Sequence, residues 1–316
     1  MKLIRSALLL ASISFSAVAV ENDQAKSWLE RLSKSLQELN FTTSFVVVKN
    51  NQAEPYHWFH GVDEQDKELE LLSLLNGPRR DILRKENIVS YIEPERPPYS
   101  VSSERISGPI PAVLSQDIST LENSYSFVPV GRSRVLGRPA QLVRIESNDQ
   151  HRFGHWLWLD QETGLLLKLA IITRKGKLLE QVQFTHLDIT DNMSDALAHL
   201  SASDIPPVID IRQGNEIQAF NWQVDWIPSG FEQIAANRHR ITLTKKPVEF
   251  LLFSDGLVDI SVYVGPSDTK QRAEEYVMDG ATVALSKVVN GIEISVVGKI
   301  PVNTAKAIAS SISFVK

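Results

Sequence analysis

The chain has 316 residues, a formal net charge of −5 and an ordinary apolar content of 43%. The mildly acidic balance gives no electrostatic basis for nucleic-acid binding, and the length leads us to expect two domains with ample material for buried cores. The chain contains no cysteine. This excludes disulfides, cysteine nucleophiles, cysteine-ligated zinc and iron–sulfur clusters.

Residues 1–19 have the pattern of a secretory signal peptide, with a basic start, an apolar core and an A-x-A cleavage site. These parts are, in order, Lys2 and Arg5, Leu8 to Phe15, and Ala17-Val18-Ala19. Cleavage after Ala19 leaves Val20 first, so no lipid can be attached through an N-terminal cysteine. No later apolar run reaches the roughly twenty residues that span a bilayer. We therefore expect a soluble protein outside the cytoplasm.

Hydrophobic periodicity predicts a helix over Asp23–Leu39, followed by strands of period two. The predicted strands are Phe41–Val48, Tyr56–His60, Arg79–Lys85, Ile88–Ile92, Pro139–Glu146, His151–Leu159, Leu165–Thr173 and Leu178–Ile189. The apolar pattern of Ser107–Leu121 is interpreted as a second helix. Short polar turns between the strands favour a large antiparallel sheet with a few helices packed against it.

Residues 201–216, which include Pro206-Pro207, are the predicted linker between a large domain (20–200) and a small domain (217–316). In the small domain, Asp255-Gly256 and Asn290-Gly291 predict β-hairpins, because both central residues of such a turn adopt positive φ. A closing helix capped by Asn303 or Thr304 completes the small sheet. The predicted fold class is α+β, mainly antiparallel β.

No set of catalytic residues or metal ligands stands out. His57 and His60 are three positions apart on a predicted strand and so point to opposite faces. His151 and His155 share a face but lie about 13 Å apart, too far for one ion. No nucleophile elbow, P-loop or dinucleotide-binding motif is present. The sequence thus predicts no metal, no cofactor and no enzymatic activity, and an exported hydrolase is an alternative without motif support.

The strands of the large sheet carry apolar side chains on both faces. Since an antiparallel sheet needs only one apolar face, helices, the other domain or a ligand must cover both. The ordinary interpretation assigns one face to helices and the other to a domain interface. A cavity between sheet and helices can also hold an acyl chain, because each buried methylene contributes about 0.8 kcal/mol. The lipid-cavity candidates are Phe45, Val47, Trp58, Tyr91, Trp156, Trp158 and Leu166.

Basic residues cluster near the predicted turns. Those singled out are Arg79, Arg80, Arg132, Arg134 and Arg138. In an acidic protein they are candidates for contacts with the phosphate or carboxylate groups of an anionic ligand. The competing interpretation is that they are ordinary solvated residues at the ends of turns.

Particular strings along the chain are recognisable. In the large domain they are residues 75–94, 130–139, 158–168 and Leu179-Glu-Gln-Val-Gln-Phe184. In the small domain they are Trp226-Ile-Pro-Ser-Gly-Phe231, Phe253-Ser-Asp-Gly-Leu257 and Val297-Gly-Lys-Ile-Pro301. In this order they resemble the RseB/MucB family of periplasmic negative regulators of the sigma-E envelope-stress response. The resemblance covers nearly the whole chain after the signal peptide.

The resemblance implies an unclosed half-barrel like that of the LolA/LolB lipoprotein carriers, with helices on its concave side, and a small C-terminal domain. It implies a soluble periplasmic regulator that binds the periplasmic segment of a membrane-anchored, RseA/MucA-like anti-sigma factor and protects it from proteolysis. A lipid or lipopolysaccharide would release this inhibition. A periplasmic lipid or lipoprotein carrier is the alternative, and homo-oligomer formation is left open. Partner-surface candidates from the matched strings are Trp226, Phe231, Phe253 and Leu257.

Overall fold

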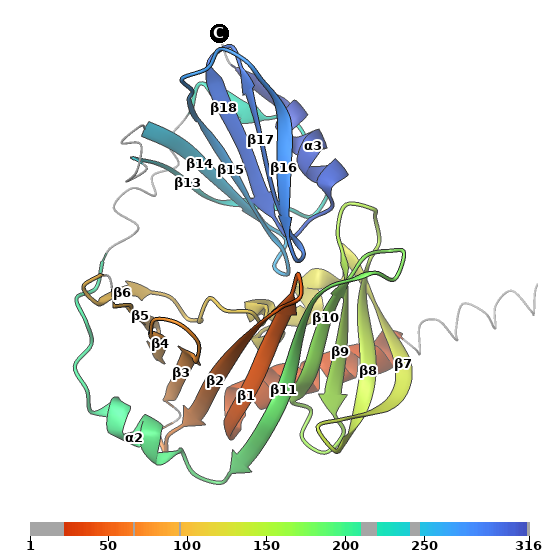
Figure 1. Ribbon diagram of the computed structural model, residues 1–316. Helices are drawn as coiled ribbons and strands as arrows, with labels where there is room; N and C mark the ends of the chain where they lie inside the picture. Colours follow the sequence, from red (N-terminus) through yellow and green to blue (C-terminus); the bar gives the residue numbers. More distant parts are fainter. Residues whose placement is uncertain (1–21, 66, 95, 210–219, 241–246, 315–316) are drawn as a thin grey trace, which may run out of the picture.

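The computed structural model describes residues 22–65, 67–94, 96–209, 220–240 and 247–314 (Figure 1). The predicted signal peptide with its cleavage site, and the part of the predicted linker from residue 210 onward, lie outside these residues. Within them, no helix combines the length and apolarity that crossing a membrane requires.

Eleven strands form one antiparallel sheet with the order β6-β5-β4-β3-β2-β1-β11-β10-β9-β8-β7. Their bounds are β1 Asn40–Lys49, β2 Gln52–Val62, β3 Glu68–Leu74, β4 Arg80–Lys85, β5 Ile88–Ile92, β6 Tyr99–Ser102, β7 Tyr125–Val135, β8 Arg138–Ser147, β9 Gly154–Asp160, β10 Leu166–Ile172 and β11 Leu178–Thr190. Among the described residues, β6 and β7 are the two edges and do not pair, so the sheet curls without closing. This confirms the predicted half-barrel.

A helix over residues 22–38 crosses the concave side of the sheet (Figure 1). It buries Leu29, Leu32 and Leu36 in one apolar core with Phe45 of β1 and Leu157 of β9. The predicted N-terminal helix is thus confirmed, and its apolar stripe faces the inside of the half-barrel.

The predicted second helix over Ser107–Leu121 is wrong. Two 3-10 helices, Ala112–Ser115 and Ile118–Leu121, occupy its second half and add buried apolar side chains to the same core. Pro109 and Pro111 lack the backbone N–H that a continuous α-helix would need there, so the chain enters the first short helix only after Pro111.

A short helix, α2 (Asp195–Ser201), packs on the convex side of the sheet. Its buried Leu197 lies against Leu69 of β3 and Leu83 of β4. The side chain of Ser194 caps the helix by accepting a hydrogen bond from the N–H of Leu197. The elements α2, β3, β6 and β7 were not among those predicted from periodicity.

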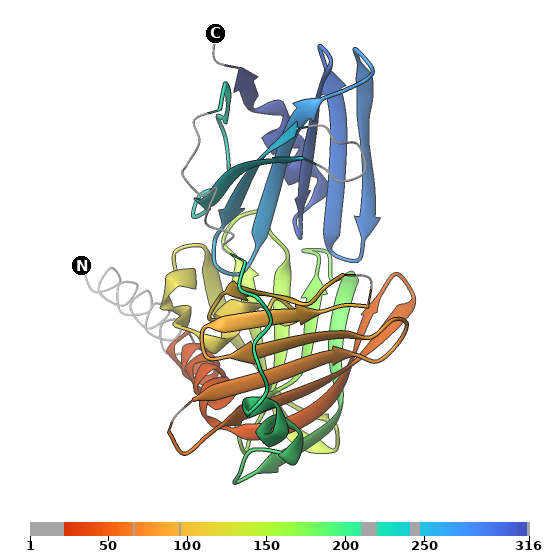
Figure 2. The same ribbon diagram turned by 90° about the vertical axis from the view of Figure 1, so that its left-hand side faces the viewer.

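The C-terminal part is a six-stranded antiparallel sheet with the order β13-β14-β15-β18-β17-β16, standing above the larger sheet (Figure 2). Its strands are β13 Glu232–Arg240, β14 Pro247–Ser254, β15 Asp259–Pro266, β16 Arg272–Asp279, β17 Thr282–Val289 and β18 Ile292–Gly298. Helix α3 (Val302–Ser310) packs against β17 and β18, and β12 (Trp222–Val224) pairs with β19 (Ile312–Phe314). The predicted α+β, mainly antiparallel class is confirmed.

Both predicted hairpins are present, but their turns differ. Asn290 and Gly291 have φ values of 53° and 78°, as the sequence predicts. At the other turn only Gly256 has a positive φ, of 92°, and the carboxylate of Asp255 instead accepts hydrogen bonds from the backbone of the next residues. The predicted capping of α3 is wrong, because Pro301 precedes the first turn and Thr304 lies within the helix.

Candidate ligand cavities and the junction of the two sheets

A cavity of about 740 Å³ lies between the concave face of β1–β4, the helix over residues 22–38 and the segment 104–116. Its apolar lining includes Leu36, Phe45, Trp58, Leu72, Ile106 and Ile110. The volume is within the range of small-molecule sites, which are mostly apolar with a few fixed polar groups. The cavity can therefore accommodate an apolar chain.

Charged side chains of β2–β4 form one wall of this first cavity. Nε1 of Trp58 donates a hydrogen bond to Oε2 of Glu70 at 2.9 Å, and Nε of Arg84 donates one to Oε1 of Glu70 at 2.6 Å. Arg84 also forms an ion pair with Glu68. Burial raises the pKa of Glu68, but hydrogen bonds from His60 and Arg84 outweigh it and hold that pKa below its usual range. The wall therefore consists of compensated charges.

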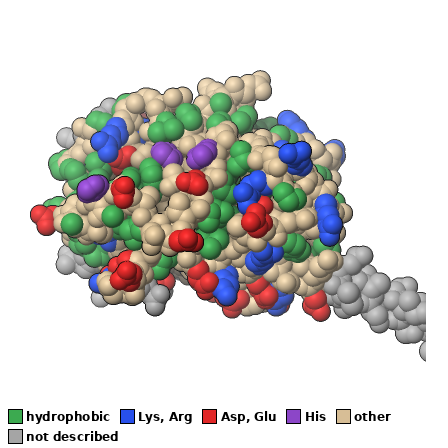
Figure 3. Space-filling view, turned by 90° about the horizontal axis from the view of Figure 1, so that it is seen from below, with side chains coloured by type: hydrophobic (Ala, Val, Ile, Leu, Met, Phe, Trp, Pro, Cys, Tyr) green, Lys and Arg blue, Asp and Glu red, His purple; other side chains and the backbone are tan. Residues whose placement is uncertain are grey.

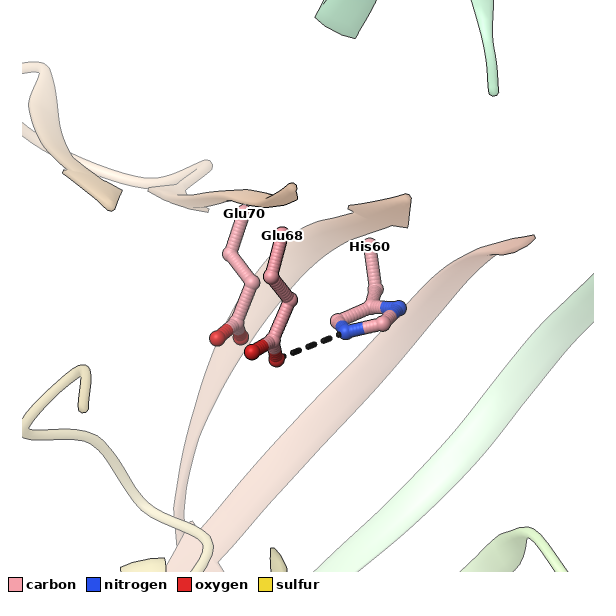
Figure 4. Close-up of side chains that lie close together, drawn as sticks. All are labelled: His60, Glu68 and Glu70. Carbon is pink, nitrogen blue, oxygen red and sulfur yellow. Dashed lines mark hydrogen bonds and ion pairs between the residues drawn. The ribbon is translucent and has the colours of Figure 1, made fainter. Parts of the chain in front are cut away.

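His60, Glu68 and Glu70 lie close enough together to be considered as metal ligands (Figure 4), since one potential ligand atom of each lies within 4.8 Å of the others. His60, however, already contacts the carbonyl oxygen of Leu39 through Nδ1 at 2.7 Å and Glu68 through Nε2 at 3.1 Å. Arg84 supplies the positive charge beside both carboxylates. The arrangement is thus explained by hydrogen bonds and ion pairs without a metal ion.

A second cavity, of about 410 Å³, lies beside the first and shares Leu72, Gly108 and Pro109 with it. Thr282 of β17 and Lys299, which directly follows β18, contribute to its wall. Its lining also contains Val47, Lys49, Tyr56, Leu74, Arg80, Ile82 and Tyr91. The acidic residues Glu54, Asp81, Glu93 and Glu180 also line it, so this cavity between the two sheets combines apolar side chains with charges of both signs.

The lipid-cavity candidates separate into three groups. Phe45 and Trp58 line the first cavity, and Val47 and Tyr91 line the second. The remaining candidates, Trp156, Trp158 and Leu166, line neither.

Strand register explains why the two tryptophans lie elsewhere. Val47 of β1, Val182 of β11, Leu169 of β10 and Leu157 of β9 form one row across the concave face. Trp156 and Trp158 flank Leu157 in β9, so their side chains project from the convex face. Leu166, by contrast, is fully buried in the core beneath the helix over residues 22–38. These three residues are therefore not part of the wall of either cavity.

The anionic-ligand candidates do not come together as one site. Arg80 lines the second cavity, and the neighbouring Arg79 donates from Nε to Asp81 at 2.6 Å. Arg138 on β8 pairs with Asp160 and Glu162, both at 2.9 Å. Six strands lie between β4 and β8 in the sheet order.

The other two candidates, Arg132 and Arg134, are exposed on β7, and Nε of Arg134 donates to the carbonyl of Gly137 at 3.1 Å. Seen from below, basic side chains are interspersed with acidic ones (Figure 3). Of the five arginines, only Arg80 therefore contributes to a described cavity.

The partner-surface candidates do not form an exposed surface. Phe231, Phe253 and Leu257 are buried in the apolar core, and Trp226 packs against that core. The ring of Trp226 meets that of His151 edge-on at 5.0 Å, and the guanidinium of Arg152 lies 4.7 Å from the ring centre of Phe231. Trp226 and Phe231 instead contact the β8–β9 loop at the junction, while Phe253 and Leu257 belong to the core.

Two ion pairs also cross the junction. Lys49 of β1 pairs with Asp279 of β16 at 2.7 Å, and Lys299 pairs with Glu180 of β11 at 2.7 Å. Gly280 sits so close to β1 that a Cβ there would lie 2.9 Å from Cβ of Lys49. The two sheets are thus joined by polar contacts beside the second cavity, whose wall includes Lys49, Glu180 and Lys299.

The described residues combine an open half-barrel, two ligand-sized cavities and a buried junction with a second sheet, which is the architecture of a binding protein. The chain matches the family models for the MucB/RseB N-terminal domain over residues 24–209 and the MucB/RseB C-terminal domain over residues 216–313. The chain therefore belongs to the MucB/RseB family, as its sequence resemblance predicted. This is a family of regulatory binding proteins rather than enzymes.

Individual relatives cover almost the whole chain. Sigma-E factor regulatory protein RseB of Salmonella typhimurium is 30% identical over 308 residues, which are 97% of this chain and 96% of that protein. Sigma factor AlgU regulatory protein MucB of Pseudomonas aeruginosa is 30% identical over 311 residues, with the same shares.

Solved structures agree with these matches. A crystal structure of MucB in complex with the periplasmic part of MucA has a TM-score of 0.72 at 29% identity and covers 92% of this chain and 99% of that one. The complex structure of Pseudomonas aeruginosa MucA/MucB has a TM-score of 0.74 at 28% identity, covering 93% and 99%.

Proposed function

We propose that this chain is a sigma-factor regulatory protein that binds the periplasmic segment of a membrane-anchored anti-sigma factor. The observation that carries the proposal is its similarity, along nearly its full length, to MucB, whose solved structures include complexes with MucA. The names of the relatives RseB and MucB, both sigma-factor regulatory proteins, support the same role. The predicted signal peptide supports a periplasmic location.

The proposed regulation has two further parts. Binding protects the anti-sigma segment from proteolysis, and a lipid or lipopolysaccharide ends this protection. The first cavity supports the lipid part, because its wall includes apolar side chains such as Phe45, Leu72 and Ile110. Arg80 in the wall of the second cavity is a cation that can contact the anionic end of such a ligand, whereas Lys49 and Lys299 already pair with Asp279 and Glu180. A ligand there would touch both sheets and so can distinguish one arrangement of them from another.

We also propose the domain division from the sequence, with domains 20–200 and 217–316 and a linker 201–216. Part of that linker packs on the half-barrel: Ser100 of β6 donates from its backbone N–H to the carbonyl of Pro207 at 2.9 Å, and Ile209 donates to Ser100 at 2.7 Å. Pro207 and Ile209 of the proposed linker are therefore held against β6.

The test uses the full mature chain and the periplasmic segment of the anti-sigma factor from the same organism. Calorimetric titration should give a saturable complex, and the chain should slow digestion of the segment by its protease. Adding lipopolysaccharide should reverse both effects. Absence of a complex contradicts the proposal, whereas a complex that lipopolysaccharide leaves intact contradicts only the lipid part.

A lipid or lipoprotein carrier is the second candidate, and the cavities are the observation that favours it. A carrier would remove a labelled lipoprotein from donor vesicles and deliver it to acceptor vesicles. Such transfer, without binding to an anti-sigma segment, would establish the carrier instead.

A further inference from the structure

The strand β16 (Arg272–Asp279) is an exposed edge of the C-terminal sheet (Figure 1). Among the described strands it pairs with β17 alone. Every residue from 273 to 277 is exposed. Its outer side therefore presents backbone N–H and C=O groups that another strand can pair with.

The side chains of this edge favour docking rather than prevent it. Val277 and Tyr276 are 71% and 51% exposed. The strand contains neither lysine nor proline, the residues with which natural edge strands commonly block further pairing. An exposed edge with adjacent apolar side chains is a template for an incoming extended segment.

The two faces of β16 have different partners within the chain. On the α3 side, Nζ of Lys306 lies 2.8 Å from Oε1 of Glu274 and 5.7 Å from the ring centre of Tyr276. Because side chains alternate along a strand, Glu275 and Val277 project together from the opposite face. That face thus offers an apolar side chain and a carboxylate two residues apart.

We propose that β16 is a docking site for an extended protein segment that adds to the sheet as a seventh strand. The segment carries an apolar residue beside Val277 and a lysine or arginine, two positions away, beside Glu275. Directly opposed residues of opposite charge stabilise strand pairs, and like charges destabilise them.

The charge of β16 also favours this occupant over a second copy of the chain. The strand contains three acidic residues, Glu274, Glu275 and Asp279, and one basic residue, an arginine. Pairing two copies of β16 would bring these acids alongside one another, whereas a basic segment complements them.

Strand β16 ends at the junction of the two sheets, so a segment bound along it lies close to the half-barrel. Asp279 at its end accepts hydrogen bonds from Nζ of Lys49 at 2.7 Å and from Nδ2 of Asn50 at 3.0 Å. A segment lying along β16 therefore runs toward the β1–β2 turn of the half-barrel. The proposal is independent of the anti-sigma factor proposal, because it rests on the edge alone.

The experiment measures binding of two fluorescent decapeptides to the full chain by anisotropy. Both have threonine at every second position; at the positions between, one alternates valine with lysine and the other alternates valine with glutamate, so that the apolar and charged side chains lie two positions apart on one face of the strand. The valine–lysine peptide should bind more tightly. Val277→Lys should weaken it about tenfold, which is about 1.4 kcal/mol, and Glu275→Lys should reverse the preference between the peptides. The matched control is Ile234→Lys on β13, the opposite edge, where the side chain is 57% exposed; it should change nothing.

Three outcomes overturn the proposal: no binding of either peptide, an equal loss in Val277→Lys and Ile234→Lys, or no preference for lysine over glutamate. Sedimentation of the wild-type chain tests the other occupant. A dimer that dissociates in Val277→Lys would assign the edge to a second copy. Glu275→Lys changes only an exposed side chain, so it keeps the test decisive if Val277→Lys fails to fold.

Discussion

Nε of Arg152 donates a hydrogen bond to Oδ2 of Asp255 at 2.6 Å across the junction of the two sheets, and both side chains are only 1% exposed. The hydroxyl of Tyr125 donates to the same oxygen at 2.7 Å. Burial, followed by the neighbouring charge of Asp255, raises the pKa of Tyr125. This phenol therefore stays protonated at neutral pH and donates its hydrogen bond to Asp255.

Removing either Arg152 or Asp255 should destabilise the protein, because the other side chain is left as an uncompensated buried charge. We expect Asp255→Ala to lower the free energy of unfolding by about 3 kcal/mol, measured by urea denaturation. The control is Lys34→Ala, which removes the exposed Lys34–Glu38 pair of 3.7 Å and should cost less than about 0.5 kcal/mol. Equal effects of the two substitutions would show that the junction pair does not hold the sheets together.

Gly230 is required at the junction for two reasons: its backbone has a positive φ, and neighbouring atoms leave no room for a Cβ. Its φ is +87°, and a Cβ there would lie 2.1 Å from Oγ of Ser124 and 3.4 Å from a guanidinium nitrogen of Arg152. Gly77 has a similar φ of +75° but an open surrounding. We expect Gly77→Ala to cost about 1 kcal/mol through backbone strain, and Gly230→Ala to cost about 2 kcal/mol.

Thermal unfolding checks this difference. Adding Ser124→Ala to Gly230→Ala should recover the stability that the steric clash removes, and should leave the loss that backbone strain causes. If the two single glycine variants are equally stable, close packing at Gly230 does not contribute to the junction.

The buried His155 should make the protein less stable in acid. Burial, and then the positive charge of Lys299, lower the pKa of its imidazole from 6.5 to about 3. Between these values the unfolded chain binds a proton that the folded chain does not, so stability falls as pH decreases from 6.5 toward 3. At pH 5 the loss should reach about 2 kcal/mol.

His155→Leu should remove this part of the pH dependence, measured as the difference in unfolding free energy between about pH 7.5 and pH 5. The exposed His186 provides the control, since His186→Leu should leave the difference unchanged. An unaltered difference in His155→Leu would mean that other groups cause the acid sensitivity.

Filling the first cavity should prevent binding of an apolar probe. Ala112 lines this cavity, and Ala112→Trp places an indole in it. We expect the affinity for a fluorescent fatty acid to fall at least tenfold, about 1.4 kcal/mol. Trp156→Ala, which changes an aromatic side chain on the convex face, should have no effect. The reverse result would place the ligand on the convex face.

The sequence predicted local structure where a single segment determines it. Leu29, Leu32 and Leu36 define the stripe of the first helix, and Asn290-Gly291 defines its own turn. Strand β3 was missed because Glu68 and Glu70 interrupt its apolar pattern, and they face inward only because Arg84 of the next strand compensates them.

The positions of the candidate functional residues were harder to predict, because they are determined by contacts with distant parts of the chain. Alternation placed Trp156 and Trp158 together on one face but could not show which face of the sheet is concave. Phe231 and Phe253 were expected on a partner surface, yet both are buried, and Arg152 of the β8–β9 loop packs against the ring of Phe231 at the junction. Arg152 lies about 80 positions before Phe231 in the chain, too far apart for a periodicity pattern to relate the two residues.

The central claim is that the chain binds an anti-sigma factor. Its most direct test is calorimetric titration of the full mature chain with the periplasmic segment of that factor from the same organism. The proposal predicts a saturable complex with a defined stoichiometry, weakened by lipopolysaccharide. An absence of binding heat and of co-elution, with lipoprotein transfer by the same preparation, would contradict the regulatory role and favour the carrier.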